Sequence, residues 1–476
     1  MSLAYLKRQP SLLQHPAIYT DFYELTMAQG YFLAGRKDDR ASFDYFFRDI
    51  PFDGGYVIFA GLSDLIELLE DFQFHEDELD YLSDQRFRKE FIRYLRDFRL
   101  NVDMMAPKEG EIVFPYCPIL RVEGTVIETQ ILETLILNIL NFESLIATKA
   151  SRMKYAAGDR KVIDFGLRRA QGFGGIQASK AAFIGGAEAT SNTYSSFVHG
   201  LPPSGTMAHS WIQSFEDELT AFRTYAEFYP DSSILLVDTY DTLESGVPNA
   251  IKVSGELEEK GYRLKGIRLD SGDLAYFSRK ARKQLDDAGL DYVKIAVSNQ
   301  LDEYLIKSLL SQNAPVDLFG VGTRLVTGYE TPALDGVYKL SSVNNDPRLK
   351  ISENVEKTTF PGRKKVIRYG DGNGSFHGDG IFLAENDDST IIRHPFYPAK
   401  YTDVSPFKAE PLLHPVLKNG ALQGDLSAPP ESARYAQERL EKLNPEHKRF
   451  ENPHIYKVGI SEKLMNLRDT LTKKMK

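Results

Sequence analysis

The chain has 476 residues, of which 42% are hydrophobic and 26% charged, and its formal net charge is −9. This composition is typical of a globular protein with a substantial core, and the length suits about three domains of roughly 150 residues. The negative charge excludes a general basic surface for nucleic acid or an anionic membrane, and the single cysteine, Cys117, excludes an intrachain disulfide framework.

Hydropathy along the chain predicts no membrane-spanning segment. No stretch approaches the roughly 18 uninterrupted apolar residues of a transmembrane helix. The longest apolar run, at 131–140, is interrupted by polar residues at helical spacing, and the first ten residues lack the apolar core of a signal peptide. We therefore expect a cytoplasmic protein in a reducing compartment, with neither nucleic acid nor membrane as a partner.

The first part of the chain mixes helix and strand patterns. Residues 20–34 have the amphipathic pattern of a helix that Thr20 or Asp21 could cap. This order predicts an α+β domain over 1–137. We further expect a strand over 41–48, a turn over 51–56, two helices over 61–99 and strands within 111–127.

Short apolar runs recur from about residue 160, each followed by polar or glycine-rich residues and a helical pattern. Continuous apolar runs suit strands covered on both faces, and serial β–α units form a parallel sheet or barrel whose chemistry gathers at the carboxyl ends of its strands. We expect these β–α units to form a second domain over 138–340, an α/β domain that carries the catalytic site. Its expected strands lie at 161–166, 182–187, 234–238, 264–270, 293–298 and 316–322, with G-T-M-A-H at 205–209 as a seventh unit.

The remaining residues, 341–476, are polar and rich in turns. We expect them to form a C-terminal region that packs partly on the N-terminal domain. The segment 357–369 predicts a Pro-Gly hairpin crowded with positive charge, 425–432 predicts a linker and a helix start, and the chain closes with a helix that ends in lysines.

Two neighbouring expected strands end in the same D-x-x-D pattern, which places Asp238 and Asp241 after one and Asp270 and Asp273 after the other. Each aspartate could simply cap the helix that follows. Four carboxylates at one edge of a sheet could equally serve chemistry, and the pattern alone leaves both interpretations open.

The expected strand at 316–322 runs into Gly320, Gly322 and Thr323 before a helix. Glycines at such a junction let backbone N–H groups approach a ligand, and a helix N-terminus favours an anion such as the phosphate of a sugar phosphate. The spacing is neither that of a P-loop nor of a complete dinucleotide fingerprint. Tight-turn glycines are the alternative.

Three arginines stand near the same edge. Arg168 and Arg169 follow a strand end, where guanidinium groups suit a phosphate or carboxylate unless local acidic residues pair with them. Arg268 lies inside an expected buried strand, so it needs an anionic partner from either substrate or protein.

His209, in S-G-T-M-A-H-S-W, is the remaining candidate. A neutral imidazole can attack phosphorus or act as a general base near neutral pH. With no nearby second histidine or cysteine, a zinc site is not supported. A hydrogen-bonded structural histidine near a helix start is the alternative.

Seven segments together resemble the nicotinate phosphoribosyltransferase family, and they occur in the family's order over most of the first 370 residues. The resemblance implies an α/β fold: an irregular α/β barrel of the type II phosphoribosyltransferase kind, with an N-terminal α+β domain and a C-terminal extension. The segments are T-D-F-Y-E-L-T-M-A-Q-G-Y, D-F-G-L-R-R-A, G-G-A-E-A-T-S-N, G-T-M-A-H-S-W, G-I-R-L-D-S-G-D-L, F-G-V-G-T and P-G-R-K-K.

The resemblance also implies a reaction, in which nicotinate, 5-phosphoribosyl-1-pyrophosphate and ATP give nicotinate mononucleotide, pyrophosphate, ADP and phosphate in the salvage route to NAD. By the same resemblance, His209 is transiently phosphorylated, Tyr23, Thr206 and Arg268 contact nicotinate, and Thr323 contacts the phosphoribosyl phosphate. A homodimer with shared active sites is implied, with Tyr23 acting across subunits.

Residue chemistry agrees with these implied roles. Asp270 or Asp273 could stabilise an oxocarbenium-like state or hold the ribose hydroxyls and Mg²⁺. A nicotinamide-specific or quinolinate-specific phosphoribosyltransferase and a non-catalytic barrel remain alternatives at this point, although the quinolinate enzymes have much shorter chains.

Overall fold

The computed structural model describes residues 14–475, which fall into two compact units. Unit 1 combines the described residues up to Leu145 with those from Ala333 onward, and unit 2 is Ile146–Pro332. The prediction about the first ten residues lies outside the described part of the chain. The division into domains at 1–137, 138–340 and 341–476 stays a prediction.

A seven-stranded antiparallel sheet in unit 1 joins strands from both ends of the chain. β12 (Gly336–Val343) pairs with β1 (Arg40–Phe47), and β19 (His414–Lys418) pairs with β3 (Asp103–Ala106). β1 confirms the strand predicted over 41–48, and its side chains are almost all buried. The strand order is β13 (Asp346–Pro347), β12, β1, β5 (Leu120–Thr125), β3, β19 and β20 (Ala421–Leu422).

The prediction for residues 20–34 is confirmed by α1 (Phe22–Leu33), but neither predicted capping side chain caps it. Asp21 occupies the N-cap position without a side-chain cap bond, and the Thr20 hydroxyl donates to the Glu24 carboxylate instead. The prolines predicted to bend the next strands lie between β4 (Ile112–Val113), which pairs with β2 (Val57–Ile58), and β5.

The prediction of two helices over 61–99 is wrong, because the structure has three. They are α2 (Leu62–Glu70), α3 (Glu76–Asp84) and α4 (Lys89–Arg96). A new helix begins after α2 because the His75 backbone N–H donates to Glu78 Oε2 at 2.8 Å, and Arg86, with φ of 68°, separates α3 from α4.

A second, six-stranded sheet of unit 1 shows that the predicted hairpin over 357–369 is wrong. β14 (Lys364–Gly370) pairs with β15 (Phe376–Leu383) and β18 (Lys408–Pro411), so residues 371–375 make the turn. The segment's charge is not all exposed, because Lys364 is buried and lies 2.7 Å from Asp44 Oδ2. The strand order is β17 (Tyr401–Asp403), β16 (Ile391–Arg393), β21 (Val458–Ser461), β15, β14 and β18.

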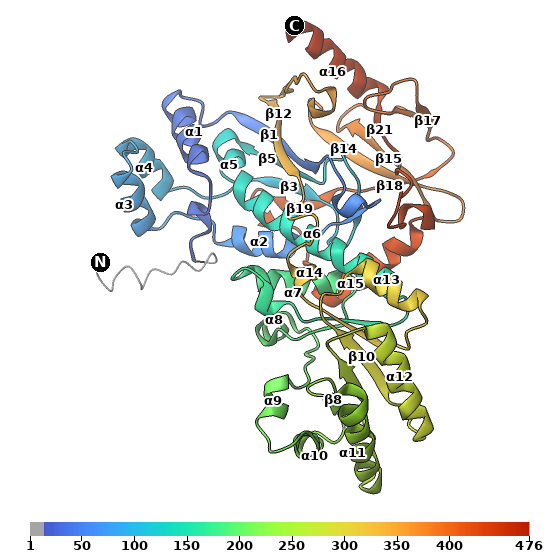
Figure 1. The fold of residues 1–476 in the computed structure, drawn as a ribbon. Coiled ribbons are helices and arrows are strands. Elements are labelled where there is room, and N and C mark those ends of the chain that lie inside the picture. Colours follow the sequence, from blue (N-terminus) through green and yellow to red (C-terminus); the bar gives the residue numbers. More distant parts are fainter. Residues whose placement is uncertain (1–13, 476) are drawn as a thin grey trace. The chain divides into compact units, whose positions relative to one another are not determined.

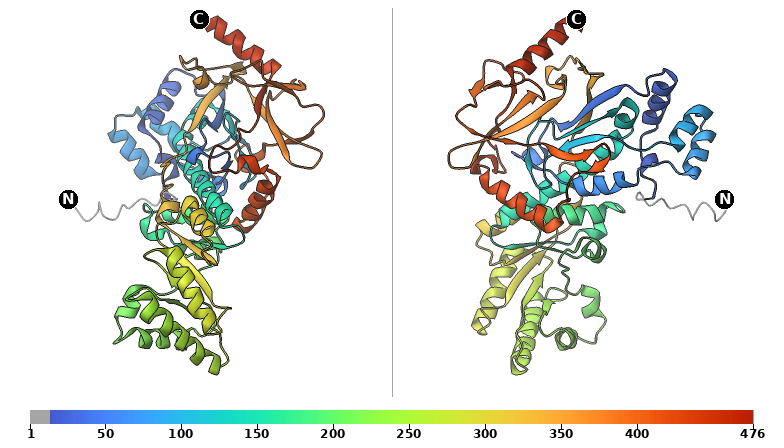
Figure 2. Two further views of the ribbon diagram at one scale, coloured as in Figure 1. Left: turned by 45° about the vertical axis from the view of Figure 1, so that its right-hand side comes forward. Right: turned by 180° about the vertical axis from the view of Figure 1, so that it is seen from behind.

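Two C-terminal helices confirm their predictions. α15 (Pro429–Lys442) begins where a helix start was expected, and α16 (Glu462–Met475), dark red in Figure 2, packs beside β15 and β21.

α15 is held by a buried ionic network. Arg368 on β14 donates to Asp379 Oδ2 at 2.7 Å and to Glu111 Oε1 at 2.6 Å, and Glu111 Oε1 also accepts from Arg439 Nε of α15 at 2.9 Å.

The helical segment Val126–Ala157, formed by α5 (Val126–Gln130) and α6 (Glu133–Ala157), is long and apolar enough to cross a membrane by length and composition alone. However, 67% of its most apolar window is buried inside the protein. Ile131, Leu135 and Ile139, at helical spacing, belong to the main core cluster of unit 1. The segment therefore packs as a core helix.

Unit 2 contains a six-stranded sheet in which every pairing is parallel, which confirms the α/β class. Helices α10 (Glu218–Phe228), α11 (Val247–Glu259) and α12 (Leu274–Asp287) follow one another beside it (Figure 1). α13 (Glu303–Ser311) is the helix of the β–α unit that begins with β10. The strand order is β7 (Ala189–Thr190), β6 (Lys161–Asp164), β11 (Leu318–Val321), β10 (Lys294–Ser298), β9 (Gly266–Leu269) and β8 (Ile234–Leu236).

Two predicted strands of this unit are wrong. Residues 182–184 close α7 (Gly174–Ile184), whose alanine-rich sequence favours a helix, and β7 begins only after Gly185 and Gly186. A Cβ on Gly185 would lie 2.2 Å from the Ala147 carbonyl oxygen, so this turn needs glycine. Residues 205–208 are an extended loop rather than a strand, and they lead directly into α9 (His209–Gln213).

Candidate active site

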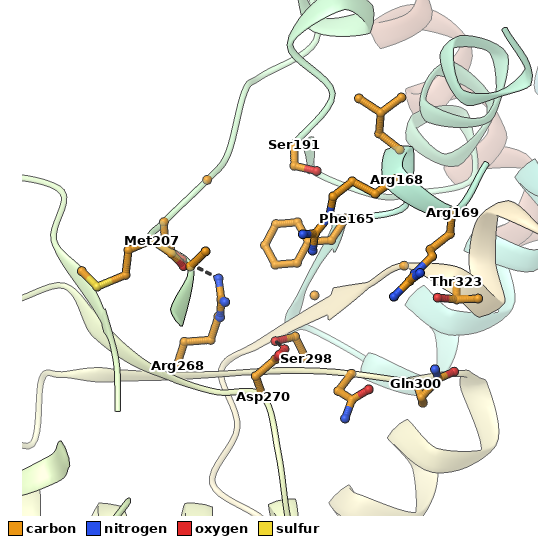
Figure 3. Close-up of a pocket in the computed structure, with 17 residues that line it drawn as sticks. Phe165, Arg168, Arg169, Ser191, Met207, Arg268, Asp270, Ser298, Gln300 and Thr323 are labelled. Carbon is orange, nitrogen blue, oxygen red and sulfur yellow. Dashed lines mark hydrogen bonds between the residues drawn. The ribbon is translucent and has the colours of Figure 1, made fainter. Parts of the chain in front are cut away.

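A cavity of about 450 Å³ in unit 2 opens where β6, β9, β10 and β11 end (Figure 3). Three arginines line it against one aspartate, Asp270, so its charge suits an anionic ligand. The lining residues are Phe165, Leu167, Arg168, Arg169, Ser191, Gly205, Thr206, Met207, Ala208, Arg268, Asp270, Ser298, Asn299, Gln300, Gly320, Gly322 and Thr323.

The loop after β6 is fixed by Asp164, the last residue of that strand. Its buried carboxylate accepts hydrogen bonds from the Gly166 backbone N–H at 2.7 Å, from Ser179 Oγ at 2.8 Å and from Thr190 Oγ1 at 2.7 Å. Burial raises the pKa of Asp164, and these three hydrogen bonds oppose the rise. The contacts hold the backbone that carries Phe165 into the cavity.

Arg168 and Arg169 come next on that loop, and their side chains extend toward the part of the cavity where Phe165 and Thr323 lie (Figure 3). Among residues 14–475, neither forms an ion pair with a carboxylate, so the expected alternative of local acidic partners does not apply. Both guanidinium groups are exposed and available to a phosphate or carboxylate.

Gly320, within β11, and Gly322, directly after that strand, allow Phe165 to pack closely. A Cβ on Gly320 would lie 2.4 Å from the Phe165 ring, and one on Gly322 would lie 3.2 Å from the Phe165 carbonyl oxygen. The helix that follows, α14 (Thr323–Val326), has a single turn, so its dipole is small. An anion here depends on backbone N–H groups, Thr323 and the arginines rather than on a helix dipole.

Arg268 projects from β9 and donates a hydrogen bond from Nη1 to Thr206 Oγ1 at 2.6 Å. Its Nε is buried and has no hydrogen-bond partner among the described residues. Burial lowers the pKa of this guanidinium, while the charges of Asp270 and Asp238 oppose that effect. The protein therefore orients Arg268 through Thr206 and leaves most of its donors for a ligand.

His209 begins α9 beside the cavity. Its Nδ1 lies 3.1 Å from Thr239 Oγ1, and its Nε2 lies 3.8 Å from Asp270 Oδ2. The side chain is 39% exposed, so a reactant can reach it. This geometry gives the imidazole a fixed orientation and an open face, which a purely structural histidine does not need.

The two D-x-x-D segments divide their aspartates between both expected roles. Asp241 accepts from the backbone N–H groups of Leu243 and Glu244 at 3.0 and 2.8 Å and caps the helical turn after β8. Asp273 accepts from the Tyr276 N–H at 2.9 Å and caps α12, and it is not among the residues that line the cavity.

The first aspartates of the two segments meet at the site. The Asp238 carboxylate accepts the Asp270 backbone N–H at 2.6 Å and the Ser271 hydroxyl at 2.8 Å, and Ser298 donates to Asp270. Asp238 Oδ1 is buried and has no partner among the described residues. Neighbouring strand ends are thus joined through their carboxylates.

Nine lining residues were not named as site candidates from the sequence: Phe165, Leu167, Ser191, Gly205, Met207, Ala208, Ser298, Asn299 and Gln300. Ser298 ends β10, and Asn299 and Gln300 follow it, at the edge of the sheet that also carries Asp270 and Gly320. Their place at the end of a predicted strand was the signal in the sequence that could have indicated them. Asn299 and Gln300 have φ values of 87° and 52°, an unusual pair of left-handed residues of the kind that gathers at functional sites.

Tyr23 belongs to unit 1, on the first turn of α1, and its side chain is exposed. Burial of part of the phenol and the charge of Glu133 raise its pKa to about 12, so it is neutral at physiological pH. The predicted nicotinate contact of Tyr23 stays a prediction.

A parallel sheet with an arginine-lined cavity at its carboxyl edge, a glycine loop and an oriented histidine defines an α/β protein with a candidate site for an anionic ligand. Three family models match the chain: the nicotinate phosphoribosyltransferase N-terminal domain over 18–141, the family itself over 160–387 and the C-terminal domain over 363–468.

Curated and solved relatives agree. The chain is 43% identical over 458 residues to a nicotinate phosphoribosyltransferase of Bacillus subtilis, covering 94% of this chain and 93% of that one. It matches the crystal structure of human nicotinic acid phosphoribosyltransferase with a TM-score of 0.84 at 32% identity over 95% and 99% of the two chains. It matches a nicotinate-nucleotide pyrophosphorylase from Pyrococcus furiosus with a TM-score of 0.73 at 26% identity over 93% and 99%. The chain belongs to the nicotinate phosphoribosyltransferase family.

Proposed function

We propose that this protein joins nicotinate to 5-phosphoribosyl-1-pyrophosphate, forming nicotinate mononucleotide and pyrophosphate for NAD salvage, with ATP hydrolysis coupled to the reaction. The observation that carries the proposal is that Arg168, Thr206, Arg268, Asp270, Gly320, Gly322 and Thr323 line one and the same cavity. Family membership supplies the substrates, and the cavity has the charge and the polar groups to take them.

The nicotinate site in this proposal lies around Arg268. Nicotinate is a planar aromatic anion, so a guanidinium oriented by Thr206 suits its carboxylate and the Phe165 ring suits its face. The phosphate of the sugar then binds Thr323 and the backbone of Gly320 and Gly322. This arrangement leaves the two exposed loop arginines for further phosphate oxygens.

In the transfer step, the pyridine nitrogen of nicotinate forms a bond to the ribose C1 as the bond from C1 to pyrophosphate breaks. The ribose gains oxocarbenium-like positive charge, which a nearby carboxylate stabilises. We assign this role to Asp270, whose orientation Ser298 and Asp238 fix. A catalytic role for Asp273 stays a prediction that its capping contact does not support.

We further propose that ATP phosphorylates His209. An imidazole nitrogen attacks the γ-phosphorus, ADP leaves with the electron pair of the broken P–O bond, and water later hydrolyses the phosphohistidine. The support is geometric: Thr239 and Asp270 flank the ring, and its side chain is open to solvent. The added phosphoryl group would bring negative charge and acceptor oxygens beside the cavity.

Mg²⁺ is the metal we expect with these phosphorylated substrates. No group of three or more acidic, histidine or cysteine side chains among the described residues could hold a metal by itself. Mg²⁺ usually binds one or two carboxylates together with substrate phosphates, and Asp270 and Asp238, with its unpartnered Oδ1, fit that mode. Bound there, Mg²⁺ would neutralise phosphate charge.

The finer features of the family are proposals as well. We propose a cytoplasmic homodimer in which Tyr23 completes the nicotinate site of the partner subunit. We also propose that the parallel sheet of unit 2 is part of an irregular α/β barrel of the type II phosphoribosyltransferase kind. The support is the unbroken series of β–α units from β8 to β11.

A nicotinamide-specific enzyme is the main competing function. The cavity favours the acid, because three guanidinium groups against one carboxylate suit an anion better than a neutral amide. The test is an assay of purified protein for nicotinate mononucleotide, with and without ATP, in which nicotinamide competes with nicotinate. Product from nicotinate that rises with ATP supports the proposal, whereas preferential use of nicotinamide contradicts it.

A further inference from the structure

Glu24, the residue after Tyr23, is a fully buried carboxylate on the first turn of α1. Its Oε1 accepts the Thr134 backbone N–H at 3.0 Å and the Thr134 hydroxyl at 2.6 Å, while its Oε2 accepts the Thr20 hydroxyl. A buried carboxylate needs such donors, and here three of them satisfy it.

These contacts tie the start of α1 to the start of α6. Thr134 lies in the first turn of α6, where backbone N–H groups lack helical partners and a negative charge is favourable. The Thr134 hydroxyl also accepts the backbone N–H of Asp21 at 3.1 Å. A single threonine therefore holds both ends of the Asp21–Glu24 turn, and Glu24 serves α6 in the way that a capping side chain does.

Tyr23 lies inside this turn, and its phenol lies near Glu133, the residue before Thr134. The Tyr23 side chain is 46% exposed, whereas that of Glu24 is fully buried. The backbone of Tyr23 thus has fixed neighbours on both sides, and its partly exposed phenol is attached to a rigid turn. An aromatic side chain that must meet a ligand gains affinity when its position is fixed in advance.

We propose that Glu24, acting with Thr134, is a positioning residue that fixes the first turn of α1 so that Tyr23 is presented for nicotinate binding. The proposal rests on the proposed function, since Tyr23 contacts nicotinate only if that function holds. Glu24 itself has no contact with substrate and takes no part in bond making.

The charges around Glu24 belong to three elements. Glu133 of α6 adds negative charge nearby, and Lys339 of β12 lies 3.4 Å from Glu133 Oε1. Tyr338 of β12 is buried and neutral, and Asp21 stands at the start of α1. Burial and Glu133 raise the pKa of Glu24 to about 7, against the hydrogen bonds from Thr134 and Thr20.

The test compares variants of the full-length protein. Thr134→Val keeps the shape of the side chain and removes the hydroxyl that bonds both Glu24 and Asp21. Glu24→Ala removes all three acceptor contacts, and Glu24→Gln keeps acceptor capacity for Thr134. Glu78→Ala is the matched control, because Glu78 is another buried glutamate of unit 1, bonded to His15 and to the His75 N–H.

We expect Thr134→Val and Glu24→Ala to raise the nicotinate KM roughly 3- to 10-fold with kcat nearly unchanged. The nicotinate KM of Glu24→Gln should stay close to the wild-type value. Amide hydrogen exchange in the first turn of α1 should be faster in Thr134→Val and Glu24→Ala and unchanged in Glu24→Gln. In a Tyr23→Ala background, Thr134→Val should add nothing to the KM, because both changes act through the same side chain.

Several results would overturn the inference. The first is that Thr134→Val and Glu24→Ala change the nicotinate KM no more than the control Glu78→Ala does. Another is an equal loss of kcat for all substrates, which would make Glu24 merely structural. A wild-type protein that forms no nicotinate mononucleotide would instead contradict the proposed function, so the two failures are distinguishable.

Discussion

Arg268 donates one hydrogen bond to Thr206, at 2.6 Å, and no other described residue accepts a hydrogen bond from its guanidinium. An arginine has five N–H donors, so this contact fixes the orientation of the side chain while leaving most donors unused. The loop 205–208 thus fixes the orientation of Arg268 in the cavity. Arg268 and Thr206 are best tested as a pair.

Arg268→Lys should lower kcat/KM for nicotinate roughly 10- to 100-fold, because a lysine ammonium cannot reproduce the planar pair of donors that a carboxylate accepts. Steady-state kinetics with nicotinate as the varied substrate measures this. Arg223→Lys is the control, since Arg223 forms an exposed pair with Glu256 at 2.6 Å. Equal losses in both variants, or a loss of thermal stability alone, would assign Arg268 a structural role.

His209→Ala should abolish transfer of label from γ-³²P-ATP to the protein, while nicotinate mononucleotide formation should persist at a lower rate without ATP stimulation. Acid-labile, base-stable label in the wild type identifies phosphohistidine. Thr239→Val, which removes the contact to Nδ1, should reduce the rate of labelling without abolishing it. Label of equal strength in His209→Ala would place the acceptor elsewhere.

Gly320→Ala should damage the site by displacing Phe165, because the new Cβ would lie 2.4 Å from the ring. We expect a loss of roughly 1–3 kcal/mol in the free energy of unfolding and at least a tenfold loss in kcat/KM. Gly255→Ala on α11 is the matched control, since nothing lies within 4 Å of its Cβ position. That substitution should stabilise the protein by up to about 1 kcal/mol through helix propensity and leave kinetics unchanged.

Glu24→Gln should change how stability depends on pH. Because burial raises the pKa of folded Glu24 from 4.5 to about 7, the folded chain binds this proton more tightly than the unfolded chain does. The carboxyl therefore favours folding below about pH 4.5, and this contribution is lost as the pH rises through 7. Glutamine does not titrate, so Glu24→Gln should gain about 3 kcal/mol relative to wild type between acidic and mildly alkaline pH. Urea unfolding at several pH values measures the difference, and a constant difference would contradict the prediction.

Much of unit 2 could be predicted from its sequence because buried parallel strands are continuous apolar runs, and such runs are visible without neighbours. The same logic places Asp270, Arg168 and Gly320 at one edge, since parallel strands end together. It fails at residues 182–187, where alanine and isoleucine suit a helix as well as a strand. The need for glycine in this turn comes from the Ala147 carbonyl oxygen, which would lie 2.2 Å from a Cβ on Gly185.

The rest of the site depends on contacts that no local pattern carries. Phe165 enters the cavity because Asp164 is held from Ser179 and Thr190, residues that are distant in sequence. The separate uses of Asp270 and Asp273 also need the fold, because both follow the same strand and only hydrogen-bond geometry separates a capping carboxylate from one that lines the cavity. Glu24 was invisible for the same reason, since its partner Thr134 lies more than a hundred residues away.

The buried network of Arg368, Asp379, Glu111 and Arg439 has a consequence for shortened forms of the protein. Removing α15 would withdraw Arg439 from Glu111, together with the Tyr435 hydroxyl that Glu111 accepts at 2.5 Å. Glu111 would lose two of its four hydrogen-bond donors, and leaving a buried charge without its partners typically costs several kcal/mol. Any minimal version of this protein that keeps the ionic network around Arg368 and Glu111 intact must therefore extend at least through α15.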